Sequence, residues 1–524
     1  MKTVILMIFI IGNLFAWEIN THRAIDRKAI EVSKNLQTFI ENSGISGSKS
    51  YYNNEIFENY GTTYLTYIKD DDIGEKNGVS KWGQTFGTKP SYQKMIEAGT
   101  ILEDALWQDA DWIAQGGDGR FNNHFYEAQN GGHKLTYGYG FHVNAVDWVT
   151  DVNVPTANPN LYNYPRAMRY FLLGFTEEDP NERRKYQAKM LVSVGHMLHM
   201  VNDMNVPAHV RDDAHPFGDP LEVWMRGGTD GSNAGIGFHV KGNTVVGKIN
   251  SNSFAPYRNN TIHKQSKVAD FMTAEATFTS ENFVSKDTLY LDNDTYLPNR
   301  NTTSYSAYQD IGNDVRKRYI RNQHGTKIAI ELDSYLCRNI QKIYYPNHPS
   351  RRGRGLCGAP TTIKGDYTVF KESGEVLIKR AMSNAVGFLD YFFRIQLSVT
   401  VDCGGITVKN ISKTSLVKDT SSITLKKSSI LRFEYIKSNG AMEAATIDVD
   451  PDRPIDATYD PTVGIFYLTK DIKPGESFTI PVKHAISLSS SIIAVYTHDI
   501  RPSEGIDKAV AVAKINKPMI ACGN

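Results

Sequence analysis

Residues 195–224 read GHMLHMVNDMNVPAHVRDDAHPFGDPLEVW and contain most of the candidate metal ligands of the chain. His199 and Asp203 are four residues apart on a predicted helix, so their side chains leave the same helix face one turn apart. Pro207 ends this helix, and His209 follows two residues later in a predicted loop. A histidine and an aspartate at the end of a helix, with a second histidine just beyond it, suit a hard or borderline cation such as zinc.

Two more candidate ligands, His215 and Glu222, lie at the irregular end of the same stretch. Two prolines and a glycine break this part of the chain, so neither side chain is readily explained as part of a core. His196 shares the helix face of His199 and Asp203, but we interpret it as a packed histidine beside the metal ligands.

The amino terminus has the order of a secretory signal, with Lys2, an apolar run over residues 4–11, and Ala16 at the expected cleavage site. The apolar run is too short to span a bilayer. We therefore expect residues 1–16 to be removed before Trp17 and the protein to be secreted, either outside the cell or into a periplasm. A retained membrane anchor is the alternative.

Composition narrows the class of protein. The 524 residues carry 58 Lys and Arg against 57 Asp and Glu, which gives no long-range electrostatic reason to expect nucleic acid or an acidic membrane as the main partner. The four cysteines form no CxxC pair, which excludes zinc ribbons and thioredoxin-like chemistry. In an exported chain they favour the disulfides Cys337–Cys357 and Cys403–Cys522, although four cysteines allow three connectivities and free buried thiols are the alternative.

The apolar periodicity between residues 17 and 399 is mostly helical. Helical repeats are strongest in residues 21–41, 182–204 and 373–397. Residues 226–262 are rich in Gly and Asn and predict a loop-rich insertion or small hairpin.

After residue 399 the pattern changes to short β-branched segments separated by turn residues. The predicted strands are 405–410, 421–426, 430–436, 464–469, 477–482 and 491–497. Strands at this spacing predict an antiparallel sandwich over residues 400–524. The chain is thus predicted to be multidomain, with a mainly all-α catalytic domain over residues 17–399 followed by an all-β sandwich.

The His199-x3-Asp203-x3-Pro207-x-His209 pattern resembles the zinc-dependent bacterial phospholipases C of the alpha-toxin group and their relatives, the single-strand-specific zinc nucleases. In this superfamily the mature chain begins with a tryptophan whose amine and carbonyl bind a metal, and the predicted cleavage exposes Trp17. An early histidine follows, at a spacing that His22 matches. The resemblance covers about residues 17–399.

The same resemblance implies nine ligand positions and three zinc ions. One zinc would be held by Asp104, His124, His199 and Asp203, a second by His209, His215 and Glu222, and a third by Trp17, His22 and the shared Asp203. Asp104 would also be the general base of the reaction, and Asp109 and Asp111 are alternatives for its position.

This chain departs from the family at the last carboxylate, which usually lies four residues after its histidine. That spacing would select Asp219, but the neighbouring Gly218 and Pro220 make the stretch poor helix. We therefore favour Glu222 as the ligand, with His239 as a further candidate.

The resemblance implies hydrolysis of a phosphodiester, because bound zinc neutralises phosphate charge and lowers the pKa of an attacking water. Family members that prefer choline headgroups have characteristic residues at positions occupied here by Asn20, Ala105 and Phe121, and only Phe121 agrees, as a substrate-binding residue.

We expect a phospholipase C that releases phosphorylated headgroups from phospholipids. A zinc-dependent single-strand nuclease or nucleotidase is the alternative, and a non-catalytic, metal-stabilised interaction protein is a second. The near-neutral charge favours phospholipid over polynucleotide. In position, the predicted sandwich resembles the membrane-docking domain that some of these phospholipases append, which would bring peripheral membrane contact.

Overall fold

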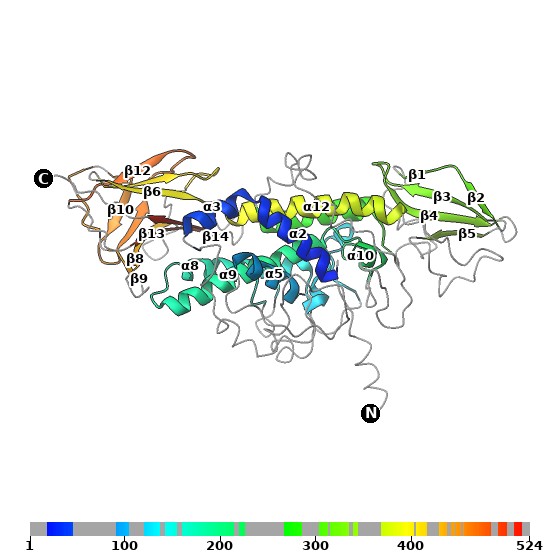
Figure 1. The fold of residues 1–524 in the computed structure, drawn as a ribbon, viewed down its shortest axis with the longest axis horizontal. Helices are drawn as coiled ribbons and strands as arrows, with labels where there is room; N and C mark the ends of the chain where they lie inside the picture. The colour runs from blue at the N-terminus through cyan, green and yellow to red at the C-terminus, as the bar shows by residue number, and fades with distance from the viewer. Residues whose placement is uncertain are drawn as a thin grey trace, which may run out of the picture.

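The chain has helices at its centre and an antiparallel sheet structure at each end (Figure 1). In this computed structural model the described residues are 18–43, 45, 91–103, 120–136, 142–154, 160–213, 219–225, 267–285, 303–312, 315–334, 339–343, 368–402, 405–416, 429–436, 442–445, 447–450, 452–453, 455–483, 491–499 and 508–515. The predicted signal segment, the predicted insertion at 226–262 and all four cysteines lie outside these ranges.

Helices form in the three stretches where the apolar repeat is strongest, and further helices that were not singled out from the sequence lie between them. The helices are α2 (Glu18–Val32), α3 (Lys34–Ser43), α5 (Tyr92–Glu103), α7 (Ala145–Thr150), α8 (Tyr164–Leu173), α9 (Pro180–Asp203), α10 (Pro220–Met225), α11 (Val268–Asn282) and α12 (Thr368–Phe392), with the 3₁₀ turns η3 (Arg120–Asn123) and η4 (Ala128–Asn130). The predicted helix at 21–41 is divided at Ser33, whose hydroxyl accepts the Leu36 N–H at the start of α3. No helix in the described ranges combines the length and apolar character needed to cross a membrane.

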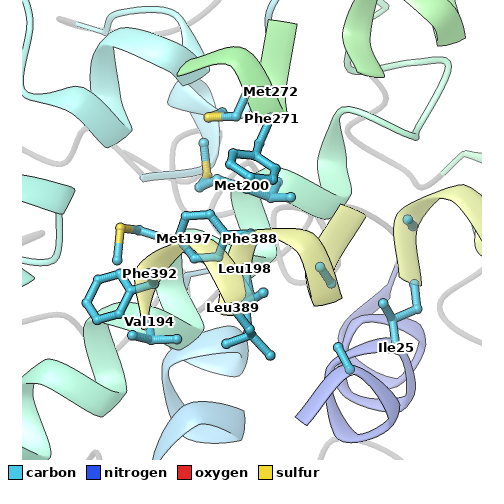
Figure 2. Packing of buried hydrophobic residues seen from close by; sticks show 14 of the residues in the cluster. Ile25, Val194, Met197, Leu198, Met200, Phe271, Met272, Phe388, Leu389 and Phe392 are labelled. Atoms are coloured by element: carbon cyan, nitrogen blue, oxygen red, sulfur yellow. The ribbon is translucent and has the colours of Figure 1, made fainter. Parts of the chain in front are cut away.

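Helix α9 is the centre of the helical part. Asp179 caps its first turn and Pro180 occupies its first position, a placement that proline favours. Its last four turns are buried on every side, as expected of a helix surrounded by other helices. Met197 and Met200 of α9 lie among side chains of α11 and α12, including Phe271 and Phe388 (Figure 2).

Helices α5 and α9 approach each other unusually closely. A Cβ atom at Gly99 would lie 1.9 Å from the Val192 carbonyl oxygen, and one at Gly195 would lie 1.9 Å from the Ile96 carbonyl oxygen. The two backbones can be this close because both positions are glycine, which has no Cβ atom. The contact places the end of α5 beside the last turns of α9, where the candidate ligands lie.

A five-stranded antiparallel sheet interrupts the part of the chain that the sequence predicts to be mainly all-α. Its strands are β1 (Ser304–Tyr305), β2 (Gln309–Gly312), β3 (Val315–Arg321), β4 (Lys327–Ser334) and β5 (Asn339–Ile343), in the order β1-β3-β4-β5 with β2 also paired to β3. The sheet packs on the helical core through β4, which contacts α12 and places Ile328 and Ile330 in that core. The sequence predicted mainly helix over this part of the chain and did not predict these strands, because their pairing is a tertiary property.

The carboxy-terminal region contains the two antiparallel sheets that the predicted sandwich requires. One holds β6 (Leu397–Asp402), β7 (Gly405–Asn410) and β12 (Ser477–Ile480); the other holds β8 (Ser429–Ile436), β9 (Met442–Ala444), β10 (Ala457–Asp460), β11 (Ile465–Leu468), β13 (Ser491–Asp499) and β14 (Lys508–Ile515). Val408 and Phe478 of the first sheet share a core with Phe433 of the second. The predicted strand at 421–426 lies outside the described residues.

Strand β13 joins the sandwich to the helices because its successive residues face opposite sides. Ile492, Ala494 and Tyr496 belong to the sandwich core, whereas Ile493 and Val495 belong to the helical core. Strand β14, paired with β13, contacts α3 and α8. Strand β6 runs across the predicted boundary at residue 399, and the division into domains stays a prediction.

Candidate metal centre

Three regions that are distant in sequence converge on one buried cluster. It contains His22 of α2, His124 just after η3, His199 and Asp203 of α9, His209 beyond that helix, and Glu222 of α10, each no more than 2% exposed. These are six of the nine predicted ligands. The other three, Trp17, Asp104 and His215, lie outside the described residues, as do His239, Asp109, Asp111 and the side chain of Phe121.

The Asp203 carboxylate is the centre of the cluster. Its Oδ1 lies 3.2 Å from Nε2 of His22. Its Oδ2 lies 3.0 Å from Nδ1 of His124, 3.5 Å from Nε2 of His199 and 3.7 Å from Nδ1 of His209. Because both oxygens face imidazole nitrogens, this carboxylate has the geometry to link two neighbouring cation sites.

Two groups of potential ligand atoms share Asp203. One contains His22 and His199, the other contains His124 and His209, and within each group the ligand atoms lie within 4.8 Å of one another. The resemblance instead placed His124 with His199, so the grouping in the structure differs from the predicted one, and the assignment of ligands to individual ions stays a prediction.

The residues of the cluster fit zinc. Ligand atoms about 2.1 Å from a tetrahedral zinc ion stand about 3.4 Å apart, and the distances from Asp203 to the ring nitrogens of His22, His124 and His199 are 3.2, 3.0 and 3.5 Å. Imidazole and carboxylate are also ligand types that zinc prefers. Burying this many ionisable groups together is costly unless a charge compensates them, and a cation would do so.

Hydrogen bonds to backbone carbonyls orient two of the imidazoles. Nδ1 of His199 donates to the Thr100 oxygen at 2.8 Å, and Nδ1 of His209 donates to the His124 oxygen at 3.0 Å. Since a carbonyl only accepts, both Nδ1 atoms carry the proton, and Nε2 of each ring is then the nitrogen that could bind a metal. Nε2 of His209 lies 4.0 Å from Oε1 of Glu222.

The segments of His124 and His209 also hold each other in place. The Tyr126 N–H donates to the His209 oxygen at 2.9 Å, opposite the bond from the His209 ring to the His124 oxygen. The Phe125 ring stacks on the His209 imidazole with 4.7 Å between centroids. These contacts bring His124 to the end of α9, although it lies far from that helix in sequence.

The structure separates the roles of Asp219 and Glu222. Oδ1 of Asp219 accepts the backbone N–H groups of Leu221 and Glu222 at 2.8 and 3.4 Å, which caps α10. Pro220 stands at the start of this helix, where proline is favoured, and Asp219 lies just before the helix and not within it. Glu222 turns into the cluster and is fully buried, and its role as a ligand stays a prediction.

Electrostatics distinguish two buried carboxyls. Burial raises the pKa of Asp203, but the charges of three neighbouring histidines outweigh this and hold its pKa well below the ordinary value. Burial raises the pKa of Asp26 from 3.8 to about 7, although Thr100 and Asn202 donate hydrogen bonds to its carboxylate at 2.5 and 2.9 Å. Of these two carboxyls, Asp203 is therefore the one that favours the ionised form.

Sequence reasoning missed Glu103, which lies in the same buried region. Its Oε1 is 3.6 Å from Nε2 of His124 and accepts the indole N–H of Trp148 at 3.0 Å. Its Oε2 contacts Nδ1 of His196, whose ring stacks on Tyr162 with 4.0 Å between centroids. The only sequence signal for Glu103 is its place directly before Asp104.

Solved structures similar to this chain include two clostridial alpha-toxins. No family model and no curated protein matches the chain. The alpha-toxin from Clostridium absonum is similar at 10% identity and a TM-score of 0.28, over 95% of this chain and 94% of that one. An alpha-toxin of Clostridium perfringens from an avian strain is similar at 10% identity and a TM-score of 0.26, over 95% and 98%. TM-scores this low carry no argument about function, and the evidence for function lies in the residues of the site.

Proposed function

We propose that this chain is a secreted zinc-dependent hydrolase of phosphodiesters and, within that class, a phospholipase C. The observation that carries the proposal is the Asp203 carboxylate, which faces four histidines with its two oxygens. A carboxylate shared between neighbouring metal ions is typical of sites that hydrolyse phosphoesters. When bound, zinc supplies neutralisation of the phosphate charge and a lower pKa for the attacking water.

The residues of the chain have separable tasks in this reaction. Asp203 fixes the spacing of the two ligand groups, because it belongs to both. The hydrogen bonds from Nδ1 of His199 and His209 keep their Nε2 atoms directed at the site. Burial of the site strengthens each electrostatic contact with the substrate phosphate. Asp104, as general base, would accept the proton of the attacking water at its carboxylate.

The cluster favours an enzyme over a metal-stabilised interaction protein. A structural zinc site typically uses four ligands around one ion and shares none of them. Here the two groups converge on one carboxylate, and Glu222 approaches His209 at 4.0 Å from a further element. Such an arrangement is built to hold several cations close together, which is useful to catalysis rather than to folding alone.

The deciding experiment measures release of phosphorylated headgroup from phosphatidylcholine vesicles by zinc-loaded protein beginning at Trp17. Single-stranded DNA and a nucleoside monophosphate are tested with the same preparation, and the metal content is measured by mass spectrometry. Zinc-dependent headgroup release supports the proposal. Digestion of DNA without headgroup release would replace the phospholipase with a nuclease, and turnover of no substrate by zinc-containing protein would refute the hydrolase.

A further inference from the structure

A buried carboxylate outside the predicted ligand set touches the metal centre. Glu103 is the last residue of α5 and is 1% exposed. Its partners come from three other parts of the chain: His124 after η3, Trp148 of α7 and His196 of α9. The Gly99–Gly195 contact between α5 and α9 is what allows Glu103 to reach His196 and His124.

His124 is held between two carboxylates. Its Nδ1 lies 3.0 Å from Oδ2 of Asp203, and its Nε2 lies 3.6 Å from Oε1 of Glu103. The two nitrogens lie on different edges of the ring, so the carboxylates define its orientation from both sides. The contact with Glu103 is at ion-pair distance and is longer than a hydrogen bond.

Glu103 is itself fixed by groups that do not bind metal. Trp148 donates its indole N–H to Oε1 at 3.0 Å, and Nδ1 of His196 contacts Oε2. The His196 ring is in turn stacked on Tyr162 with an interplanar angle of 6°. A carboxylate with both oxygens engaged in this way is suited to orienting a neighbour rather than to binding a cation.

We propose that Glu103 is a positioning residue of the metal centre, accepting the Nε2 proton of His124 and thereby directing Nδ1 of that ring at the metal. The inference rests on the metal centre of the proposed function but not on its substrate. His199 and His209 are oriented by backbone carbonyls, whereas His124 faces a carboxylate. A carboxylate partner makes an imidazole a stronger ligand, so retention of metal depends on Glu103.

The test is Glu103→Gln, which keeps the shape of the side chain but replaces one accepting oxygen with an amide nitrogen. We expect zinc affinity, measured by competition with a chelator, to fall roughly 10- to 100-fold, as is usual when such a partner is lost. The visible spectrum of the cobalt(II)-substituted protein should also change, because a reoriented imidazole alters the ligand field.

Glu97→Gln is the matched control. Glu97 lies on the same helix and is buried, but its carboxylate pairs with Arg23 and Arg27 at 3.4 and 2.8 Å. This variant should lose stability without changing the cobalt spectrum or the zinc affinity. A change of the cobalt spectrum confined to Glu103→Gln therefore identifies positioning rather than general loosening of α5.

Folded Glu103→Gln protein with wild-type zinc affinity and cobalt spectrum would overturn the inference. If that variant does not fold, Trp148→Phe decides the question, because it keeps an aromatic ring and removes only the N–H bonded to Glu103. A smaller loss of zinc affinity with a change of the cobalt spectrum in Trp148→Phe supports the inference. Wild-type zinc affinity and cobalt spectrum in that variant overturn it. Wild-type protein that binds zinc but hydrolyses no substrate would refute the proposed function and leave this inference standing.

Discussion

The interiors of the helical part and of the sandwich differ in what they bury. Between the two sheets of the sandwich, Leu431, Phe433 and Phe466 pack with other apolar side chains. The helical interior is also apolar around α12, but it encloses four histidines and Asp203 at the end of α9. Apolar burial stabilises the first interior by itself, whereas the second requires compensation of buried charge. Metal binding should therefore change the stability of the helical part, and it should leave the stability of the sandwich unchanged.

The largest expected effect comes from Asp203→Asn, which removes the charge shared by both ligand groups. We expect loss of bound zinc and a fall in hydrolysis beyond the roughly 100-fold that loss of an orienting partner costs. Metal content by mass spectrometry and headgroup release measure this. Asp179→Asn is the control, since it changes the same residue type at the other end of α9 and asparagine caps a helix equally well. Equal zinc content in both variants would contradict the bridging role.

In the sandwich, Phe433→Ala should lower the free energy of unfolding by about 3–5 kcal/mol, because it leaves a cavity in a fully buried core. Denaturant unfolding measures the loss. Zinc affinity of the folded variant should not change, since Phe433 packs against Phe466 and not against the cluster. A large drop in zinc affinity would show that the two interiors are not independent.

Gly195→Ala tests how the helical part brings its ligands together. A Cβ there would lie 1.9 Å from the Ile96 oxygen, so α5 and α9 must separate. We expect destabilisation of about 1–3 kcal/mol, as for overpacked cores, together with weaker zinc binding. Ser193→Ala on the same helix removes only a hydrogen bond to the Lys189 oxygen and should leave zinc binding unchanged. Unaltered zinc affinity in Gly195→Ala would separate helix packing from the metal centre.

A pH-dependent effect should come from Asp26, whose folded-state pKa of about 7 lies above its ordinary value of 3.8. A carboxyl with a raised pKa contributes stability fully below pH 3.8, and this contribution is lost as the pH rises through 7. Asp26→Asn should remove this loss, because an amide can serve both Thr100 and Asn202 as the neutral acid does. Unfolding of wild type and variant at pH 5.5 and pH 8 measures it. Parallel pH profiles would contradict the shift.

Local patterns predicted the elements whose signals are local. Helix α9 is predicted at residues 182–204 and runs over Pro180–Asp203. Its signals are local, because the apolar repeat lies within the helix and the Asp179 cap and Pro180 lie at its first turn. The strands at 405–410 and 491–497 were predicted from β-branched alternation and are confirmed. The β1–β5 sheet was not predicted, because strands as charged as β3 are specified by their pairing partners.

The candidate site was also predictable only where its signals are local in sequence. Types and spacings of residues singled out His199, Asp203 and His209, because one helix end and one loop place them together. Glu103 was missed because its contact with His196 spans 93 residues, and the Asp26 bond to Asn202 spans 176. No spacing rule connects residues at such separations.

The sequence by itself determined which residue types stand at the end of α9 and which faces of the helices and strands are apolar, since these follow from periods of 3.6 and 2. Only the tertiary structure decided that His22 meets His199, that His124 meets His209, and that Glu103 stands behind His124. The physical reason is packing: two glycines let α5 and α9 approach, and backbone hydrogen bonds tie the His124 segment to the His209 segment.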